Sequence, residues 1–236
     1  MLFKNVEDSD YLKNILLSLR KYIPDFEQEC CKDLIPWFGH GIGNIEAFYY
    51  WSLIKHLKPK VVLESGIKHG RSTRIIGKAC HQINAQHFAF DIDKIYPQLA
   101  EDMKQYPNSH LYNGDSCELF YVMMDRQFTA PVICFIDGPK TPDKYKELIK
   151  QCSKFPNCLA IISHDCYPKS ICRKYFEYCV GKFFKDVSCV IPNTDFNKDL
   201  FFLNKYIYDD ANKNKSGKRG DTLNTTSQYI GICLKN

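Results

Sequence analysis

The chain has 236 residues, of which 44% are hydrophobic and 25% are charged, and its formal net charge is +5. This composition is typical of a folded globular protein and excludes a collagen, a coiled coil or an intrinsically disordered chain. The apolar runs fall far short of the roughly 20 residues of a transmembrane helix, and the N-terminal segment does not resemble a secretory signal. We therefore expect a cytoplasmic protein without membrane contact, folded as one domain over residues 1–236.

Two segments differ from the rest of the chain. Residues 1–57 are predicted to form a helical N-terminal extension, because apolar side chains recur near helical spacing between Ile45 and Leu57. The glycine-rich segment 39–44 interrupts this pattern just before the last helix. Residues 209–226 contain almost no apolar side chains, so we expect a mobile loop there.

Residues 58–236 are predicted to form an α/β core. Short apolar runs alternate with helix-like segments, and both faces of the runs are apolar, as expected for parallel strands covered by helices on both sides. The expected strands are 61–63, 87–90, 110–112, 132–136, 159–162, 187–191 and 229–234, and the expected helices are 72–83, 95–105, 117–125 and 143–154. The alternation predicts a doubly wound, mostly parallel seven-stranded sheet of the Rossmann-like class, whose strand order the sequence does not reveal.

The charge and the cysteines leave two alternatives open. The small positive charge suits an anionic ligand or RNA, but a lysine-rich surface explains it equally well, so nucleic acid is disfavoured as a partner. Twelve cysteines are present without a CxxC pair. We therefore favour buried free thiols, with a structural zinc site as the alternative.

The turn after the first expected strand contains two glycines, Gly66 and Gly70. Gly66 permits a tight turn and a close approach of backbone, and Gly70 lets the next helix begin near the strand. Ser72 or Thr73 can cap that helix, whose free N–H groups favour a carboxylate or a phosphate. An ordinary strand–helix turn explains the same residues, so both interpretations stay open.

Acidic and polar residues follow the next strands. Asp91 lies 25 residues after Gly66, near the distance at which an acid binds ribose hydroxyls in such folds. Asp115 and Ser116 follow the third strand, where an acid can accept a hydrogen bond from a base. Helix capping is the alternative role for these side chains.

Two carboxylates, an imidazole and an ammonium group follow the fourth and fifth strands. They belong to Asp137, Lys140, His164 and Asp165. Carboxylate and imidazole ligands suit a divalent metal ion. The alternatives are turn and cap formation for the aspartates and a satisfied, partly buried side chain for the histidine.

The segments VVLESGIKHGRST, AFDIDK, NGDS, ICFIDGPK and IISHD, in this order, resemble the successive motifs of class I S-adenosylmethionine (SAM)-dependent methyltransferases. The resemblance covers about residues 59–166 and implies a site for SAM. It implies that Glu64, Gly66, Gly70 and Ser72 line the methionine end, that Asp91 binds the ribose, and that Asp115 and Ser116 bind the adenine. Lys68 stands where the common motif has its middle glycine, which macrocin-type sugar O-methyltransferases also commonly lack.

Within this superfamily, the sequence most resembles the metal-assisted O-methyltransferases of the macrocin, catechol and caffeoyl-CoA types. The resemblance implies that Asp137, His164 and Asp165 bind a divalent cation, Mg²⁺ or Mn²⁺, and that Lys140 is the general base. His164 stands where an acid is usual, which shifts the preference of the site towards Mn²⁺, iron or zinc. His164 and His40 are the alternative bases.

The expected function is methyl transfer from SAM to a hydroxyl oxygen of a small molecule or sugar. One alternative is a nucleic-acid methyltransferase that uses the basic loop 213–219, although no NPPY-like motif follows the fourth strand. The other is a protein with this fold that binds SAM without turnover. A homodimer is left open, and the acceptor itself is not predicted.

Overall fold

The computed structural model describes residues 10–31, 42–126, 129–139, 141–166, 170–183, 187–190, 196–204 and 230–235. Lys140 and the loop expected at 209–226 lie outside these residues. The strands are β1 (Val61–Ser65), β2 (Gln86–Asp91), β3 (Ser109–Asn113), β4 (Val132–Ile136), β5 (Cys158–Ser163), β6 (Val187–Val190) and β7 (Gly231–Lys235). Each apolar run therefore marks a strand to within one or two residues at either end.

The strands form one sheet in the order β3-β2-β1-β4-β5-β7-β6. The five strands from β3 to β5 are parallel, and β7 runs antiparallel to both β5 and β6. The chain moves outward from β1 to β3 and then crosses back to β4, so the order reverses between β1 and β4. Ligands of doubly wound sheets bind at this switch point, beyond the carboxyl ends of the strands.

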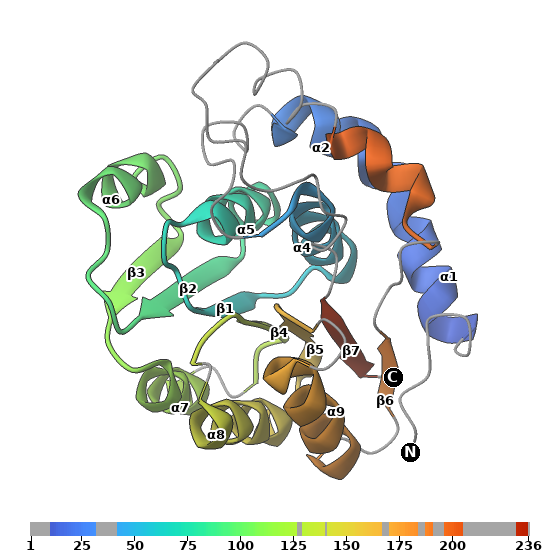
Figure 1. Ribbon diagram of the computed structural model, residues 1–236. Helices are drawn as coiled ribbons and strands as arrows, with labels where there is room; N and C mark the ends of the chain where they lie inside the picture. The colour runs from blue at the N-terminus through green and yellow to red at the C-terminus, as the bar shows by residue number, and fades with distance from the viewer. Residues whose placement is uncertain are drawn as a thin grey trace, which may run out of the picture.

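Helices cover both faces of the sheet (Figure 1). They are α1 (Asp10–Ser18), α2 (Ile23–Glu29), α4 (Asn44–Leu57), α5 (Arg71–Ile83), α6 (Pro97–Met103), α7 (Ser116–Arg126), α8 (Pro142–Lys154) and α9 (Ile171–Phe183), with short 3-10 helices η2 (Leu19–Tyr22) and η4 (Lys198–Asn204). Helices α4 and α5 lie on one face, and α7, α8 and α9 lie on the other. The α/β, doubly wound, mostly parallel fold predicted from the sequence is confirmed.

Two helices differ from the prediction. Helix α6 begins at Pro97 rather than at residue 95, because proline is favoured in the first turn, where its missing N–H costs no hydrogen bond. No helix is predicted from the sequence between the fifth and sixth strands, but α9 fills that connection.

Helix α4 is buried along nearly its whole length. It packs between the sheet and the N-terminal helices, and the ring of Phe26 on α2 contacts Phe48 and Trp51 at 5.5 and 5.8 Å between centroids. A helix enclosed on all sides also buries its polar side chains, here Asn44 and Glu46 at the start of α4. This packing places both at the carboxyl edge of the sheet.

Every cysteine whose side chain is described is a free thiol, and all of these except Cys117 are buried. Among the described side chains, the group with metal-ligand spacing contains no cysteine. Free buried thiols are therefore the arrangement observed in the described part of the chain. None of the described helices combines the length and the apolar character that a bilayer span requires.

Candidate active site

The turn after β1 lies directly against the end of β4. Gly66 has a φ of +92°, and a Cβ atom there would lie 3.0 Å from the carbonyl carbon of Asp137 and from the nitrogen of Gly138. The backbone N–H groups of these two residues donate to the carbonyl of Ser65, at 2.8 and 3.1 Å. Glycine at position 66 is thus required both by its backbone conformation and by the closeness of the two chains.

Gly70 is the second position in this turn where only glycine fits without strain. It precedes helix α5 with a φ of +77°, and an added Cβ would lie 2.4 Å from the side chain of Leu99. Ser72, in the first turn of α5, is buried. The residue before α5 therefore packs closely against α6.

Asp91 ties the end of β2 to the glycine-rich turn. Its Oδ2 accepts hydrogen bonds from the N–H groups of Ile67 and Lys68, both at 2.7 Å, and its Oδ1 accepts one from Asp93 N–H at 2.9 Å. A carboxylate offers about four acceptor positions, so about one remains for a ribose hydroxyl. Asp91 therefore orders the turn in addition to any contact with a ligand.

Asp115 caps helix α7. Its Oδ1 accepts a hydrogen bond from Cys117 N–H at 2.9 Å, and its other oxygen pairs with the ammonium group of Lys144. This ion pair is the main reason that the pKa of Asp115 lies below its usual value. The Ser116 hydroxyl is also engaged, because it accepts a hydrogen bond from Ser65 Oγ at 2.7 Å. The capping role thus falls to Asp115, whereas adenine binding by Asp115 and Ser116 stays a prediction.

Glu64 points into the protein rather than towards solvent. Its Oε2 lies 3.1 Å from Nε2 of His87 on β2, and both side chains are almost completely buried. Its Oε1 has no hydrogen-bond partner among the described residues. His87 was not singled out in the sequence because it lies inside an apolar run.

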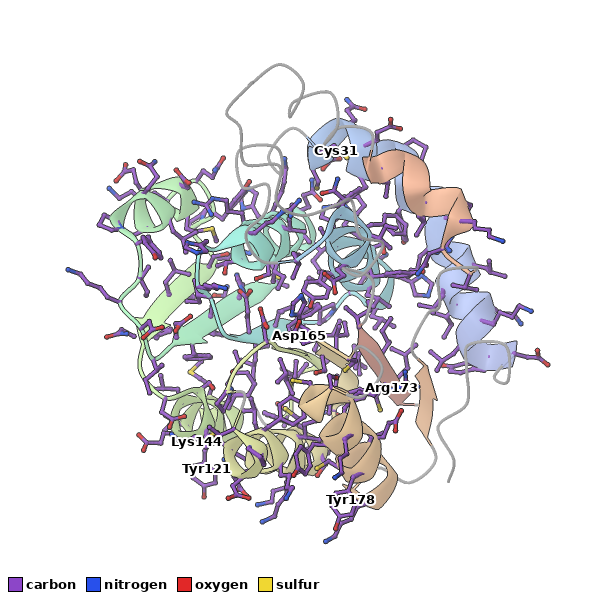
Figure 2. The ribbon with its side chains drawn as sticks, viewed as in Figure 1. Cys31, Tyr121, Lys144, Asp165, Arg173 and Tyr178 are labelled. Carbon is purple, nitrogen blue, oxygen red and sulfur yellow. The ribbon has the colours of Figure 1, made fainter. Side chains whose placement is uncertain are left out.

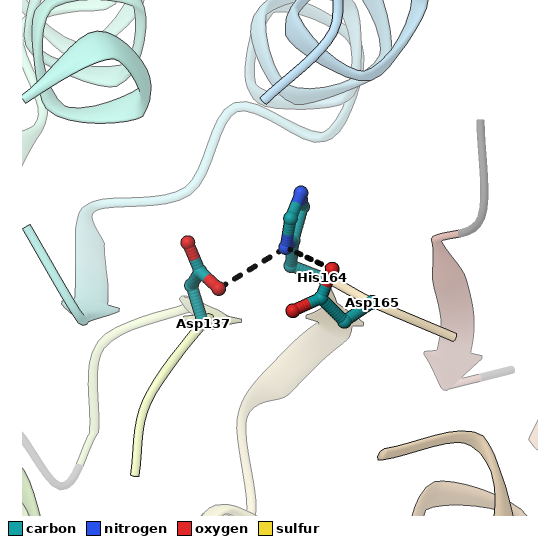
Figure 3. Close-up of side chains that lie close together, drawn as sticks. All are labelled: Asp137, His164 and Asp165. Carbon is teal, nitrogen blue, oxygen red and sulfur yellow. Dashed lines mark ion pairs between the residues drawn. The ribbon is translucent and has the colours of Figure 1, made fainter. Parts of the chain in front are cut away.

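Asp137, His164 and Asp165 form a cluster at the ends of β4 and β5 (Figure 3). Nδ1 of His164 lies 3.1 Å from Oδ1 of Asp137 and 3.1 Å from Oδ1 of Asp165. One ligand atom from each residue lies within 4.8 Å of the others. Asp165 has a φ of +58°, a left-handed conformation that aspartate tolerates better than most residues. The structure therefore brings together the three residues that the sequence analysis assigned to a metal ion.

A fourth acid, Glu46 of helix α4, contacts the other side of the imidazole. Its Oε2 lies 3.4 Å from Nε2 of His164 and also accepts a hydrogen bond from Gly43 N–H at 2.7 Å. A glutamate three residues after the residue that precedes a helix can accept a hydrogen bond from that residue's N–H, which is half of a capping box, and that was the available signal for Glu46. Nothing in the sequence indicates its closeness to His164, which lies 118 residues further along the chain.

Three carboxylates surround an imidazole that is 13% exposed. Burial lowers the pKa of His164, but Glu46 and then the aspartates more than offset this, and the net effect raises its pKa well above the ordinary value. The same negative field that favours a proton on the imidazole also favours a metal ion. A metal ion would have to displace the proton, because a metal-bound histidine nitrogen must be unprotonated.

The donor set fits a divalent cation. It offers two carboxylates and one imidazole from adjacent strand ends, and the remaining positions are left to water or substrate. Figure 2 labels Asp165 near the middle of the molecule and Lys144 out by helices α7 and α8. The cluster thus lies apart from the Asp115–Lys144 ion pair, where the adenine is predicted to bind.

Comparisons with known proteins agree on the fold. No protein-family model and no curated protein matches the sequence. A putative O-methyltransferase from Klebsiella pneumoniae is 13% identical, with 98% of each chain covered and a TM-score of 0.56. The O-methyltransferase TomG from Streptomyces achromogenes, involved in tomaymycin synthesis and solved with SAM, is 14% identical, with 88% of this chain and 90% of that chain covered and a TM-score of 0.58.

An O-methyltransferase from Bacillus cereus, solved with S-adenosylhomocysteine (SAH), gives the same result. It is 12% identical, with 95% of this chain and 96% of that chain covered, and its TM-score is 0.57. Identities this low establish architecture rather than activity. The chain has the Rossmann-like fold of the class I SAM-dependent methyltransferases.

Proposed function

We propose that this protein transfers the methyl group of SAM to a hydroxyl oxygen of a small molecule or sugar, with the help of a divalent cation. The observation that carries the proposal is the cluster of Asp137, His164 and Asp165 at the ends of β4 and β5. It lies beside the switch point of a fold that this chain shares with O-methyltransferases. A hydroxyl acceptor is favoured because metal coordination acidifies hydroxyl groups.

Three features support SAM as the cofactor. Gly66 lets the turn after β1 pack against the end of β4 at the switch point, and the first turn of α5 offers N–H groups. Asp91 retains acceptor capacity for a ribose hydroxyl. Glu64 retains a buried carboxylate oxygen with no hydrogen-bond partner among the described residues.

The residues of the cluster are proposed to have two different roles, metal binding and positioning of the imidazole. Asp137, His164 and Asp165 would hold the cation, which when bound supplies Lewis acidity to the acceptor hydroxyl. Glu46 would accept a hydrogen bond from Nε2–H of His164 and so fix the ring with Nδ1 towards the aspartates. The protein otherwise contributes mainly by positioning the two reactants.

Lys140 is proposed as the general base. It follows Asp137 by three residues, the spacing of the lysine in the catechol-type enzymes that the sequence resembles. An ordinary lysine, with a pKa near 10.4, is a poor base at neutral pH. A cation held by Asp137 would favour the neutral amine, which can then accept the hydroxyl proton.

The proposal is tested by turnover of labelled SAM with panels of phenolic, hydroxy-acid and sugar acceptors. Activity should disappear after exhaustive chelation and return with Mn²⁺ or Mg²⁺. Asp165→Asn should abolish the metal-dependent rate, whereas Asp143→Asn, on the exposed first turn of α8, should not change it. Activity that survives chelation unchanged would contradict the metal role.

A binding protein without turnover is the second candidate. Asp91 and Asp115 are already engaged by backbone N–H groups of the protein, as purely structural acids would be. Tight SAH binding by calorimetry, combined with no methyl transfer to any acceptor class in the presence of Mn²⁺, would favour this candidate.

A further inference from the structure

Helix α5 begins with a buried arginine to which the sequence analysis assigned no role. Arg71 follows Gly70 directly and is 5% exposed. Its Nη2 donates a hydrogen bond to Oδ1 of Asn44 at 2.6 Å. Its Nε has no hydrogen-bond partner among the described residues. A buried guanidinium donor without an acceptor is unfavourable, so this donor is expected to meet a ligand.

The charge of Arg71 is poorly matched by its neighbours. Asn44 is neutral, and the nearby carboxylate of Glu46 already accepts a hydrogen bond from Gly43 and faces His164. Burial lowers the pKa of Arg71 to about 10, against the opposing effect of Glu46, so the side chain is still a cation at neutral pH.

Two other arginines show what a matched guanidinium looks like in this protein. Arg74, one turn further along α5, donates from Nε and Nη2 to Asp102, at 2.9 and 2.6 Å. Arg20 donates from Nε and Nη2 to both carboxylate oxygens of Asp199. Each of these arginines binds a carboxylate with two nitrogens: Arg20 contacts both oxygens of Asp199, the usual bidentate geometry, and Arg74 contacts Oδ2 of Asp102 twice. Arg71 has the same donors but contacts an amide oxygen in the described structure.

The position of Arg71 indicates which carboxylate would complete the pair. Arg71 is the first residue of α5, directly after the turn Gly66–Gly70, and its guanidinium reaches Asn44 at the start of α4. The open donor therefore lies where two helices begin, and helix N-termini favour an anion. Under the proposed function, the amino-acid end of SAM binds at this same turn, and that end carries a carboxylate.

We propose that Arg71 binds the carboxylate at the amino-acid end of the cofactor and that Asn44 holds the guanidinium in position for this contact. The inference rests on the proposed function, since it requires SAM or SAH in the site. It adds a residue that distinguishes the complete cofactor from a nucleoside thioether without the carboxylate.

The experiment is calorimetry with two ligands that differ by that group alone, SAH and its decarboxylated analogue S-adenosyl-3-thiopropylamine. The wild-type protein should bind SAH about 30-fold or more tightly than the analogue, since a buried charge pair loses at least this factor when one partner is removed. Arg71→Met should reduce the ratio to about threefold or less, with little change in affinity for the analogue. Arg71→Lys should give an intermediate ratio, because it keeps the charge and loses the planar fork.

Controls separate this role from a structural one. Arg173→Met removes a guanidinium that already pairs with Glu177 on α9, and it should leave the ratio unchanged. If Arg71→Met does not fold, as judged by circular dichroism, Arg71→Lys and Asn44→Ala carry the test, and both should lower the ratio.

A ratio that stays at the wild-type value in the Arg71 and Asn44 variants would overturn the assignment. A wild-type protein that binds SAH and its decarboxylated analogue equally would do the same, while the proposed function stands. If the wild-type protein binds neither ligand at millimolar concentration, both the assignment and the proposed function fail.

Discussion

The two sides of the switch point use their acidic residues differently. On the side of β1, β2 and β3, Asp91 and Asp115 accept hydrogen bonds from backbone N–H groups and so fix a turn and a helix start. On the side of β4 and β5, Asp137 and Asp165 converge on the imidazole of His164. The first side fixes the shape of the turn and of a helix start, and the second concentrates carboxylates at the place where we propose that a cation and a reacting hydroxyl meet.

The two sides of the switch point contact each other at Gly66, and a substitution there should have the largest effect on stability. Gly66→Ala should destabilise the fold by about 2–4 kcal/mol, because it combines a left-handed backbone with contacts at 3.0 Å to the backbone of Asp137 and Gly138. Thermal unfolding followed by circular dichroism measures the loss. Gly138→Ala is the matched control, since an added Cβ there meets its nearest atoms at 3.7 Å. Equal effects of the two substitutions would refute the steric account.

The predicted role of Asp91 in binding SAH can be tested against Asp93, a nearby acid to which no such role is assigned. Asp91→Ala should weaken SAH binding by about 1–3 kcal/mol, because it leaves buried ribose hydroxyls and the N–H groups of Ile67 and Lys68 without an acceptor. Asp93→Asn, at an exposed position two residues beyond the end of β2, should bind SAH with unchanged affinity. Calorimetry that finds the two variants alike would remove Asp91 from the site.

The ion pair of Asp115 with Lys144 should make the smallest of these contributions, a small change in how the melting temperature depends on pH. Since Lys144 lowers the pKa of Asp115, the stabilisation is fully present above the ordinary carboxyl pKa of about 3.9 and is lost as the pH falls through the lowered value. Asp115→Asn should therefore flatten the acid side of the curve of melting temperature against pH, with a small amplitude because Lys144 is exposed.

Asp143→Asn is the control for that measurement. Asp143 is almost fully exposed, and its contact with Lys146 is longer, at 3.8 Å. Its acid curve should follow that of the wild-type protein. An Asp115→Asn curve that also runs parallel to the wild type would show that the ion pair with Lys144 adds no measurable stability.

The strands and most helices were predictable because their signals are local. Each strand is an apolar run bounded by polar residues, and the strand ends carry the candidate residues in chain order. Helix α9 was missed although its buried residues, Cys172, Phe176, Cys179 and Val180, have helical spacing. Two of these four are cysteines, which give a weak apolar signal, and charged residues lie between them.

The site was predictable only where it depends on strand ends. Parallel strands bring Asp137 and His164 to the same edge, so their proximity follows from the fold class. Glu46, Arg71 and His87 were missed because their roles depend on how α4, α5 and β2 pack together over long separations in sequence. Sequence patterns mark such residues as caps or as members of apolar runs.

The central claim is that Asp137, His164 and Asp165 bind a divalent cation. Calorimetric titration of the chelator-treated protein with Mn²⁺ tests this claim directly, because it does not require the methyl acceptor to be known. The account predicts one Mn²⁺ per chain, with proton release near neutral pH, because His164 is protonated until the metal displaces the proton. Asp137→Asn should lose this binding and Asp143→Asn should retain it. A wild-type protein that takes up no Mn²⁺ at millimolar concentration would contradict the claim and leave the cluster as a buried ion-pair network.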